Sequence, residues 1–220
     1  MSVTATLPRI LLTGFDPFGG ESINPSWEAV RALHGRRIGG HRVAARLLPT
    51  EFAASLRALK AAVRETAPAI LLGVGQAGGR ERLSIERVAI NLQDARIPDN
   101  AGAQPIDLPV IPGAPAAYFS SLPVKAMLAA LQEHGLPAEL SHTAGTYVCN
   151  HIAYAMLHLA AKRCRARAGF IHIPYLPKQA ARLRGAPSMA LDEVVRGLEI
   201  ALRVAATTRH DLAVSGGTLD

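Results

Sequence analysis

The segment AELSHTAGTYVCNHIAYAMLHLAAKRCRAR, residues 138–167, contains the change of pattern that decides the fold class. Its start, residues 138–141, is a short apolar run typical of a buried strand. An apolar-rich stretch that predicts a helix then extends from about Cys149 to Arg167. A strand that passes through a short loop into a helix is typical of layered α/β folds.

Cys149 lies at the end of this strand-to-helix turn, in the first turn of the predicted helix. Unpaired backbone N–H groups and the positive end of the helix dipole favour a thiolate there, so Cys149 is a candidate nucleophile. The strongest candidate base nearby in sequence is His172 in GFIHIP, residues 169–174, a predicted buried strand that ends at a proline. Taken singly, Cys149 is equally explained as a small buried side chain and His172 as a core histidine.

The rest of the chain continues to alternate between strand-like and helix-like stretches, which predicts one α/β domain over residues 1–220. We expect Asn24 to cap one helix, with Pro25 at its first position, and Thr50 to cap the next helix. Residues 95–123 are rich in proline and glycine, and we expect this long connection to serve as a lid or a subunit contact. The pattern predicts strands at 9–13, 41–48, 69–72, 138–141 and 169–173, helices at 25–33, 52–63, 121–134, 149–167 and 190–206, and a basic loop at 174–187.

Composition limits the classes of partner. The chain has 220 residues, 49% of them hydrophobic, which is enough for a full-sized core. The net charge of +7 raises the question of nucleic acid, but the arginines are scattered and aromatic residues for base stacking are few, so we expect no nucleic-acid partner. No apolar run is long enough to cross a bilayer, and the N-terminal residues do not resemble a signal peptide. Cys149 and Cys164, on one predicted helix, could not form a disulfide, so a reducing cytoplasm is expected.

Three cofactor or catalytic motifs do not fit this sequence. GVGQAG, residues 73–78, matches a dinucleotide-binding fingerprint, but residues 83–92 after it alternate like a strand instead of opening a helix. Cys149, His151, His158 and His172 do not have zinc-ligand spacing. The chain has no GxSxG elbow for a serine nucleophile. We therefore expect neither a metal nor an organic cofactor.

Four separated blocks resemble the pyroglutamyl peptidase I family of cysteine peptidases along nearly the whole chain. They are LLTGFDPFGG with NPSWEAV near the N-terminus, GQAGGR with ERVAIN and DARIPDN in the middle, AGTYVCN, and GFIHIP. The resemblance implies a three-layer αβα sandwich around a mixed, mostly parallel twisted sheet. It also implies a cytosolic homotetramer that removes an N-terminal pyroglutamyl residue from peptides.

The resemblance assigns site residues motif by motif. It places the nucleophile at Cys149, the base at His172 and the orienting carboxylate at Glu86, whereas sequence position alone would allow Glu81 or Asp94. Taken singly, Glu86 is explained as a carboxylate on the surface of a strand, paired with Arg82 or Arg87. The family pattern further places the substrate pocket at Phe15, Phe18 and Gln76 with Asn24 close by, and the oxyanion site at the Cys149 backbone with Arg96 at its border.

These residue types suit the implied substrate. Pyroglutamate is an uncharged lactam, so two phenylalanines can cover its ring and an amide such as Gln76 can pair with its polar edge. A free amino terminus would have to bury an unpaired ammonium against Phe15 and Phe18, which disfavours it. Two other classes remain as alternatives: a nucleoside-type phosphorylase on a similar sheet, with GFDPFGG as a phosphate loop, and an RNA-binding protein suggested by charge alone.

Overall fold

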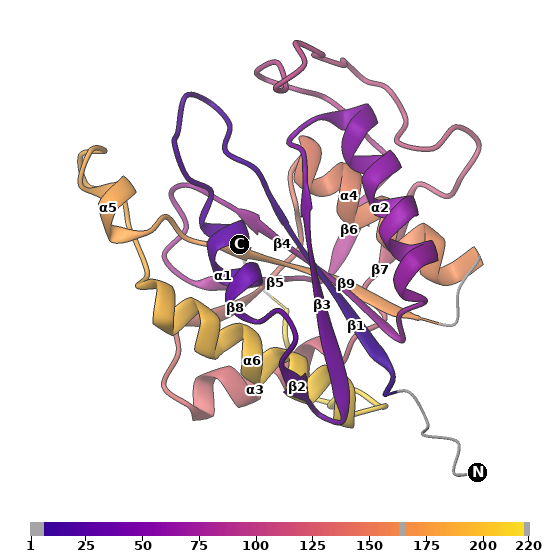
Figure 1. Ribbon diagram of the computed structural model, residues 1–220, viewed down its shortest axis with the longest axis vertical. Helices are drawn as coiled ribbons and strands as arrows, with labels where there is room; N and C mark the ends of the chain where they lie inside the picture. Colours follow the sequence, from indigo (N-terminus) through magenta and orange to yellow (C-terminus); the bar gives the residue numbers. More distant parts are fainter. Residues whose placement is uncertain (1–6, 163–165, 218–220) are drawn as a thin grey trace.

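A mixed, twisted seven-stranded sheet forms the centre of the protein, in a computed structural model that describes residues 7–162 and 166–217 (Figure 1). Its strand order is β2-β3-β1-β4-β9-β5-β8. Strand pairs β1–β3, β1–β4, β4–β9 and β5–β8 are parallel, whereas β2–β3 and β5–β9 are antiparallel. The strands are β1 (Arg9–Phe15), β2 (Arg37–Ile38), β3 (His41–Leu48), β4 (Ile70–Gln76), β5 (Leu83–Glu86), β8 (Ala138–Ser141) and β9 (Arg167–Ile173).

Helices cover both faces of this sheet, which confirms the predicted three-layer αβα sandwich (Figure 1). One face carries α1 (Pro25–Ala32), α3 (Val124–Glu133) and α6 (Leu191–Thr207). The other face carries α2 (Phe52–Thr66) and α4 (Val148–Lys162). Each helical layer buries its own hydrophobic cluster against the sheet. No helix in the described part of the chain has both the length and the apolar character that crossing a bilayer requires.

The strand-like run at residues 83–92 is two strands instead of one. β5 belongs to the main sheet, and after Arg87 the chain enters β6 (Val88–Ile90), which pairs with β7 (Ala117–Phe119) in a separate two-stranded sheet. The alternation of apolar residues is broken between Ile85 and Val88, and this break marks the place at which the chain leaves the main sheet. β7 lies within the long connection 95–123, whose suggested role as lid or subunit contact stays a prediction.

The prediction that Thr50 caps the second helix is wrong. The N-cap of α2 is Glu51, whose side chain makes no capping bond, and the Phe52 N–H donates instead to Asp99 Oδ2 at 2.8 Å. Thr50 fastens the loop after β1, because its N–H donates to Asp16 Oδ1 at 2.6 Å and its hydroxyl to the Asp16 carbonyl at 3.0 Å. The carboxylate of Asp99, which is distant in sequence, thus accepts the hydrogen bond that we expected a neighbouring side chain to accept. By contrast, Asn24 caps α1 as predicted.

Other predicted bounds shift by a few residues. The helix that begins near Cys149 ends at Lys162, and Arg167 belongs to β9. The first four residues of the GVGQAG motif, residues 73–76, belong to β4 and a strand, not a helix, follows the motif, so it lacks the strand-to-helix context of a dinucleotide site. The basic loop at 174–187 contains a short helix, α5 (Pro177–Ala180), and α3 begins at Val124 instead of residue 121. Cys164 lies outside the described residues.

Candidate active site

His172 and Glu86 form a buried hydrogen-bonded pair on two adjacent strands of the sheet. His172 lies on β9 and Glu86 on the antiparallel neighbour β5, where Glu86 pairs in register with Phe170. The imidazole and the carboxylate are therefore diagonal neighbours on one face of the sheet. His172 Nδ1 lies 2.7 Å from Glu86 Oε1, and both side chains are almost fully buried. This bond leaves Nε2 of His172 as the ring nitrogen available to another group.

Cys149 reaches the same face from α4. In the parallel pairing of β4 with β9, Gly75 lies opposite His172. A Cβ atom built on Gly75 would come within 2.7 Å of Cys149 Sγ. The sulfur therefore occupies the space left by the missing side chain, one strand away from His172, and the two residues line the same cavity. The structure thus places Cys149, His172 and Glu86 in one region of the fold.

The electrostatics of the thiol differ from the expectation at the helix start. The pKa of Cys149 is raised to about 12, mainly by burial and in addition by the Glu86 carboxylate, while the Arg80 guanidinium opposes the rise. The loss of hydration therefore raises the pKa of the thiol more than the helix dipole lowers it, because the dipole contributes only about 0.3 to 1 kcal/mol at exposed helix ends. In this environment the thiol needs a proton acceptor when it reacts.

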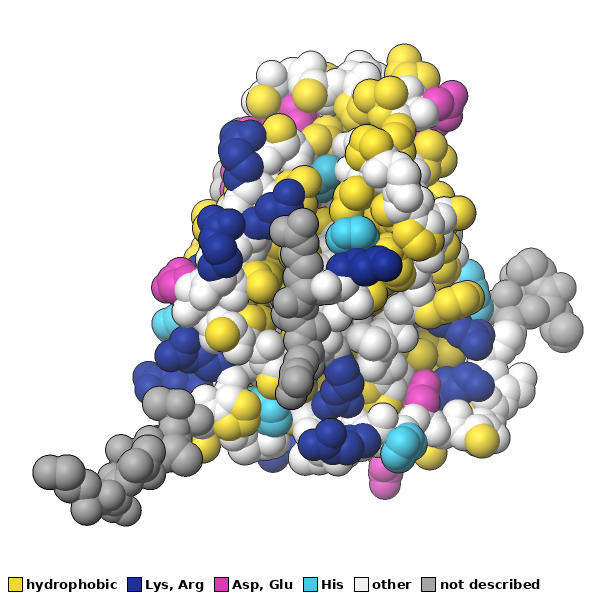
Figure 2. Space-filling view, turned by 90° about the vertical axis from the view of Figure 1, so that its right-hand side faces the viewer, with side chains coloured by type: hydrophobic (Ala, Val, Ile, Leu, Met, Phe, Trp, Pro, Cys, Tyr) yellow, Lys and Arg dark blue, Asp and Glu magenta, His cyan; other side chains and the backbone are white. Residues whose placement is uncertain are grey.

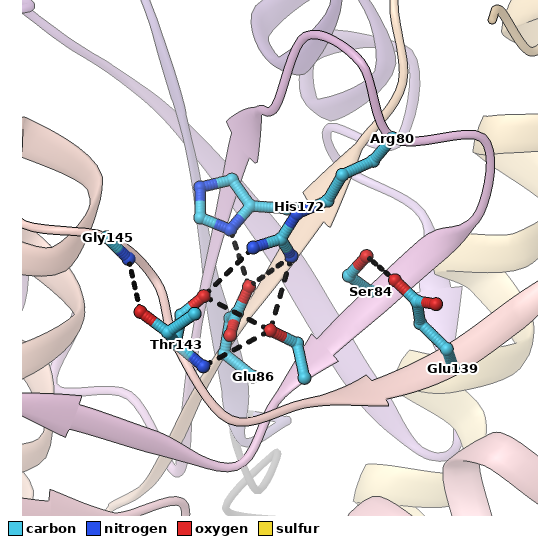
Figure 3. Close-up of polar contacts among 8 residues, drawn as sticks. Arg80, Ser84, Glu86, Glu139, Thr143, Gly145 and His172 are labelled. Atoms are coloured by element: carbon cyan, nitrogen blue, oxygen red, sulfur yellow. Dashed lines mark hydrogen bonds and ion pairs between the residues drawn. The ribbon is translucent and has the colours of Figure 1, made fainter. Parts of the chain in front are cut away.

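Arg80 is a further component of the cluster that sequence reasoning left without a role. Its Nη1 lies 2.8 Å from Glu86 Oε1 and 3.3 Å from Ser141 Oγ, and its Nη2 donates to the Thr143 carbonyl at 2.9 Å (Figure 3). The expected pairing of Glu86 with Arg82 or Arg87 on the strand surface is therefore wrong. The signal that could have found Arg80 is its position at the end of the GQAGGR block.

A cavity of about 150 Å³ opens beside the Cys149 sulfur. The residues around it come from the end of β1 and the loop after it, the segment before α2, the ends of β4 and β9, and the loop and first turn of α4, and they include no Asp or Glu. Phe15 is buried and Phe18 half-buried. The described lining is Phe15, Phe18, Asn24, Thr50, Gln76, Ala144, Tyr147, Val148, Cys149 and His172.

Tyr147 is a cavity residue that sequence reasoning missed. Its ring lies 6.2 Å from that of Phe18 and 5.5 Å from that of Phe52, measured between ring centroids. Its hydroxyl donates to the Pro98 carbonyl at 3.0 Å, and burial, the larger cause, together with the Asp99 carboxylate raises its pKa to about 12. The phenol therefore stays neutral. An aromatic residue two positions before the candidate nucleophile was the available signal.

Gln76 and Asn24 contact the cavity in different ways. Gln76 Oε1 accepts a hydrogen bond from Gln179 Nε2 at 3.1 Å. Asn24 Oδ1 accepts from the Ser26 N–H and the Ser26 hydroxyl, and Asn24 Nδ2 donates to the Asp16 carbonyl. Most of the hydrogen-bonding capacity of Asn24 is thus used in capping α1 and holding the loop.

Arg96 is exposed and does not line the cavity. Its segment nevertheless lies next to the loop before α4, because the Asp94 N–H donates to the Thr146 carbonyl at 3.1 Å and the Thr146 hydroxyl donates to the Asp94 carbonyl at 2.6 Å. Among the described residues, no three His, Cys, Asp or Glu side chains gather as a metal site requires.

Comparisons with known proteins agree with this geometry. The model of the pyroglutamyl peptidase family matches residues 8–208. The pyrrolidone-carboxylate peptidase of Escherichia fergusonii is 56% identical over 211 residues, covering 96% of this chain and 99% of that protein. The protein of the same name from Erwinia tasmaniensis is 55% identical with the same coverage.

Solved structures give the same result. The crystal structure of Bacillus amyloliquefaciens pyroglutamyl peptidase I superposes with a TM-score of 0.91 at 46% identity, over 93% of this chain and all of that one. A mutant pyrrolidone carboxyl peptidase (E192D) from Pyrococcus furiosus gives 0.87 at 42% identity, over 90% and 97% of the two chains. A family match across most of the sequence, relatives above half identity and a shared fold lead to one conclusion: this chain belongs to the pyroglutamyl peptidase family.

Proposed function

We propose that Cys149, His172 and Glu86 are the catalytic residues of this peptidase, which hydrolyses the bond after an N-terminal pyroglutamyl residue. One observation carries the assignment. The buried His172 and Glu86 side chains are in contact at 2.7 Å, and the Cys149 sulfur lies against the neighbouring strand and lines the same cavity as His172. Because the chain belongs to the pyroglutamyl peptidase family, the phosphorylase and RNA-binding alternatives are no longer needed. We infer that residues 1–220 act as one catalytic domain.

The reaction begins with proton transfer from Cys149 Sγ to Nε2 of His172 as the sulfur attacks the scissile carbonyl carbon. A thiol whose pKa is raised to about 12 by burial gives up its proton only to a base in contact with it, so general-base catalysis suits this site. The imidazolium then protonates the departing amine, which leaves a pyroglutamyl thioester on Cys149. Water, deprotonated by His172, hydrolyses the thioester and releases pyroglutamate. Glu86 holds Nδ1 of His172 protonated and stabilises the imidazolium.

The oxyanion of the tetrahedral intermediate would be bound at the start of α4. The first N–H groups of a helix have no intrahelical acceptor, and Cys149 lies in the first turn of α4. We assign its backbone N–H as one donor. Arg96 would border this site through the contacts between Asp94 and Thr146, and its exposed side chain could approach the substrate from the solvent side.

The cavity suits a small uncharged ring. Phe15, Phe18 and Tyr147 supply apolar surface, and Gln76 supplies an amide whose oxygen is already occupied by Gln179, so its N–H group would donate to the lactam carbonyl. The described lining contains no carboxylate, so a substrate with a free α-ammonium would lose its hydration without a counter-charge. Asn24, with little unused hydrogen-bonding capacity, would serve mainly to hold the loop.

We further propose a homo-oligomer, a tetramer by family resemblance, that works in the cytoplasm. Support comes from apolar side chains of the connection 95–123: Ile106, Leu108 and Phe119 are 67%, 51% and 71% exposed. Figure 2 shows hydrophobic side chains gathered over the upper part of the face that carries α2 and α4. Light scattering on the wild type and on Phe119→Ser tests this: a monomeric wild type would contradict it.

A fluorogenic assay tests the catalytic assignment. Pyroglutamyl-aminomethylcoumarin is incubated with the wild type, Cys149→Ser and Cys164→Ser, each with and without iodoacetamide; Cys164 is the only other cysteine and so the matched control. The assignment predicts thiol-sensitive release by the wild type and Cys164→Ser, and loss of release in Cys149→Ser. Release that persists in Cys149→Ser would overturn it.

A further inference from the structure

We infer that Arg80 is a positioning residue for this reaction, which holds Glu86 beneath His172 and ties the pair to the loop that leads to Cys149. The inference rests on the proposed function, because it assigns Arg80 a role through the three proposed catalytic residues. Arg80 does not line the cavity, so it would act through these neighbours and not on the substrate.

The guanidinium of Arg80 contacts two separate parts of the site. One nitrogen, Nη1, contacts Glu86 Oε1, the same oxygen that contacts His172 Nδ1. The other nitrogen, Nη2, donates to the Thr143 carbonyl. Arg80 thus bridges two segments that are distant in sequence (Figure 3). One is β5, which carries Glu86, and the other is the 142–147 loop between β8 and α4. The planar fork contacts the two segments from two separate nitrogens in a fixed geometry, whereas an ammonium group would have to reach both from one nitrogen.

Arg80 also balances the charge of Glu86. Its side chain is only 2% exposed, and its Oε2 is buried without a hydrogen-bond partner. A buried carboxylate in this state needs a nearby positive charge. In the described part of the chain its ion pairs are with Arg80 and His172. When His172 is neutral, before the thiol transfers its proton, Arg80 supplies the counter-charge.

The remaining charged and titratable groups near this cluster do not replace Arg80. Glu139, on β8, accepts a hydrogen bond from Ser84 Oγ and, as an anion, cannot balance the charge of Glu86 (Figure 3). His142, in the loop after β8, is exposed. From the loop before β5, Arg82 pairs with Glu81 at 3.4 Å, and its side chain is 50% exposed. From α4, the Cys149 thiol faces Glu86, which disfavours its ionisation, and Arg80, which favours it.

The consequence is a functional effect that a surface ion pair would not have. Exposed ion pairs contribute little to stability, and the Arg80 side chain is 27% exposed. Its contact with an almost fully buried carboxylate is a different case, because removal of the arginine leaves that charge without its partner. We therefore expect loss of Arg80 to reduce the reactivity of Cys149 and the turnover number, with little change in substrate affinity.

The test compares wild type, Arg80→Gln, Arg80→Lys and the matched control Arg82→Gln, which makes the same charge change two residues away. Three quantities are measured: kcat and KM for pyroglutamyl-aminomethylcoumarin, the rate of Cys149 alkylation by iodoacetamide as a function of pH, and Tm. For Arg80→Gln we expect kcat to fall at least about tenfold with KM changed less than about twofold, and the alkylation profile to move upward by about half to one pH unit. Arg80→Lys restores the alkylation profile but only part of kcat, and Arg82→Gln resembles the wild type.

Two results would overturn the inference. One is an Arg80→Gln enzyme whose Tm falls while the alkylation profile stays that of the wild type, since this is the behaviour of a purely structural contact. The other is an equal effect of Arg82→Gln, which would indicate a general charge effect. Failure of the proposed function is separate, because it appears in the wild type as absence of pyroglutamyl hydrolysis before any arginine is changed.

Discussion

Gln179 Nε2 donates to Gln76 Oε1 at 3.1 Å, and this contact fixes which end of the Gln76 amide can face the cavity. Gln179 is itself buried in the short helix α5, and its own Oε1 accepts from the Leu176 N–H at 3.2 Å. Since the Gln76 oxygen is turned toward Gln179, the NH₂ end of the amide is the one left for a ligand. Recognition of a lactam carbonyl would therefore depend on a residue in the segment that the sequence presented as a basic loop.

Gln179→Met tests this dependence. The variant keeps the volume but removes the donor to Gln76, so the amide is free to turn. We expect KM for pyroglutamyl-aminomethylcoumarin to rise about tenfold, the equivalent of one hydrogen bond, with alkylation of Cys149 unchanged. The exposed Gln132→Met is the control. An unchanged KM in Gln179→Met would show that Gln76 is held by other means.

Phe18 offers a cleaner test of the aromatic pocket than Phe15. Phe15 is 2% exposed and packs 6.4 Å from the Phe170 ring, so Phe15→Ala would cost about 3 to 5 kcal/mol of stability and confuse turnover with folding. Phe18 is half-buried and contacts the Tyr147 ring. We expect Phe18→Ala to lower kcat/KM about tenfold, with Tm and Cys149 alkylation close to wild type. Parallel loss of turnover and labelling would mean that the loop serves folding instead.

Gly75 should be intolerant of any side chain. A Cβ there would lie 2.7 Å from Cys149 Sγ and 2.9 Å from Phe170 Cζ, so Gly75→Ala must displace the sulfur, the ring or both. A shift of the nucleophile by about 1 Å can cost about a hundredfold in rate, and we expect kcat to fall by at least this factor.

Gly217→Ala is the control for this variant, since nothing lies within 4 Å of its Cβ position. Steady-state kinetics and Tm measured together check the prediction. A Gly75→Ala enzyme with near wild-type kcat would contradict the position assigned to the sulfur.

His151 makes stability depend on pH below neutrality. Burial lowers its pKa from 6.5 to about 4, with Lys60 adding to the effect. The unfolded chain therefore binds a proton more readily than the folded one between about pH 6.5 and 4, and stability falls as pH falls through this range. At about pH 5.5 the loss from this residue is about 1 kcal/mol.

Urea unfolding at two pH values checks this dependence. His151→Phe, which preserves a ring next to Phe52, should lose less stability between pH 7.5 and about 5.5 than the wild type does, by the same approximately 1 kcal/mol. The control is His210→Asn at an exposed position, which should leave the pH dependence unaltered. Identical pH dependence in His151→Phe and the wild type would contradict the buried neutral state.

Locally determined features could be predicted from the sequence. The strand His41–Leu48 has the predicted bounds, and Asn24 caps α1 as its Asn-Pro signal indicated. Features that depend on contacts with a distant residue could not be predicted. Thr50 lost its predicted capping role because Asp99, brought in by tertiary folding, accepts from the first N–H of α2.

The site required the sheet register, which periodicity does not contain. Three carboxylates were candidates by position, and the antiparallel pairing of β5 with β9 brings Glu86 next to His172, while Glu81 and Asp94 are exposed. The helix dipole suggested an easily ionised Cys149, but burial dominates and raises its pKa. The contacts of Arg80 and Gln179 depend on loops whose paths only the structure gives.

The most direct test of the central claim is detection of the acyl-enzyme. Wild-type protein is mixed with a pyroglutamyl ester or amide substrate, quenched in acid within the turnover time, digested and analysed by mass spectrometry. We expect the mass of one pyroglutamyl group on the peptide that contains Cys149, and its absence in Cys149→Ser. Continued turnover with no adduct, or an adduct on Cys164, would contradict it.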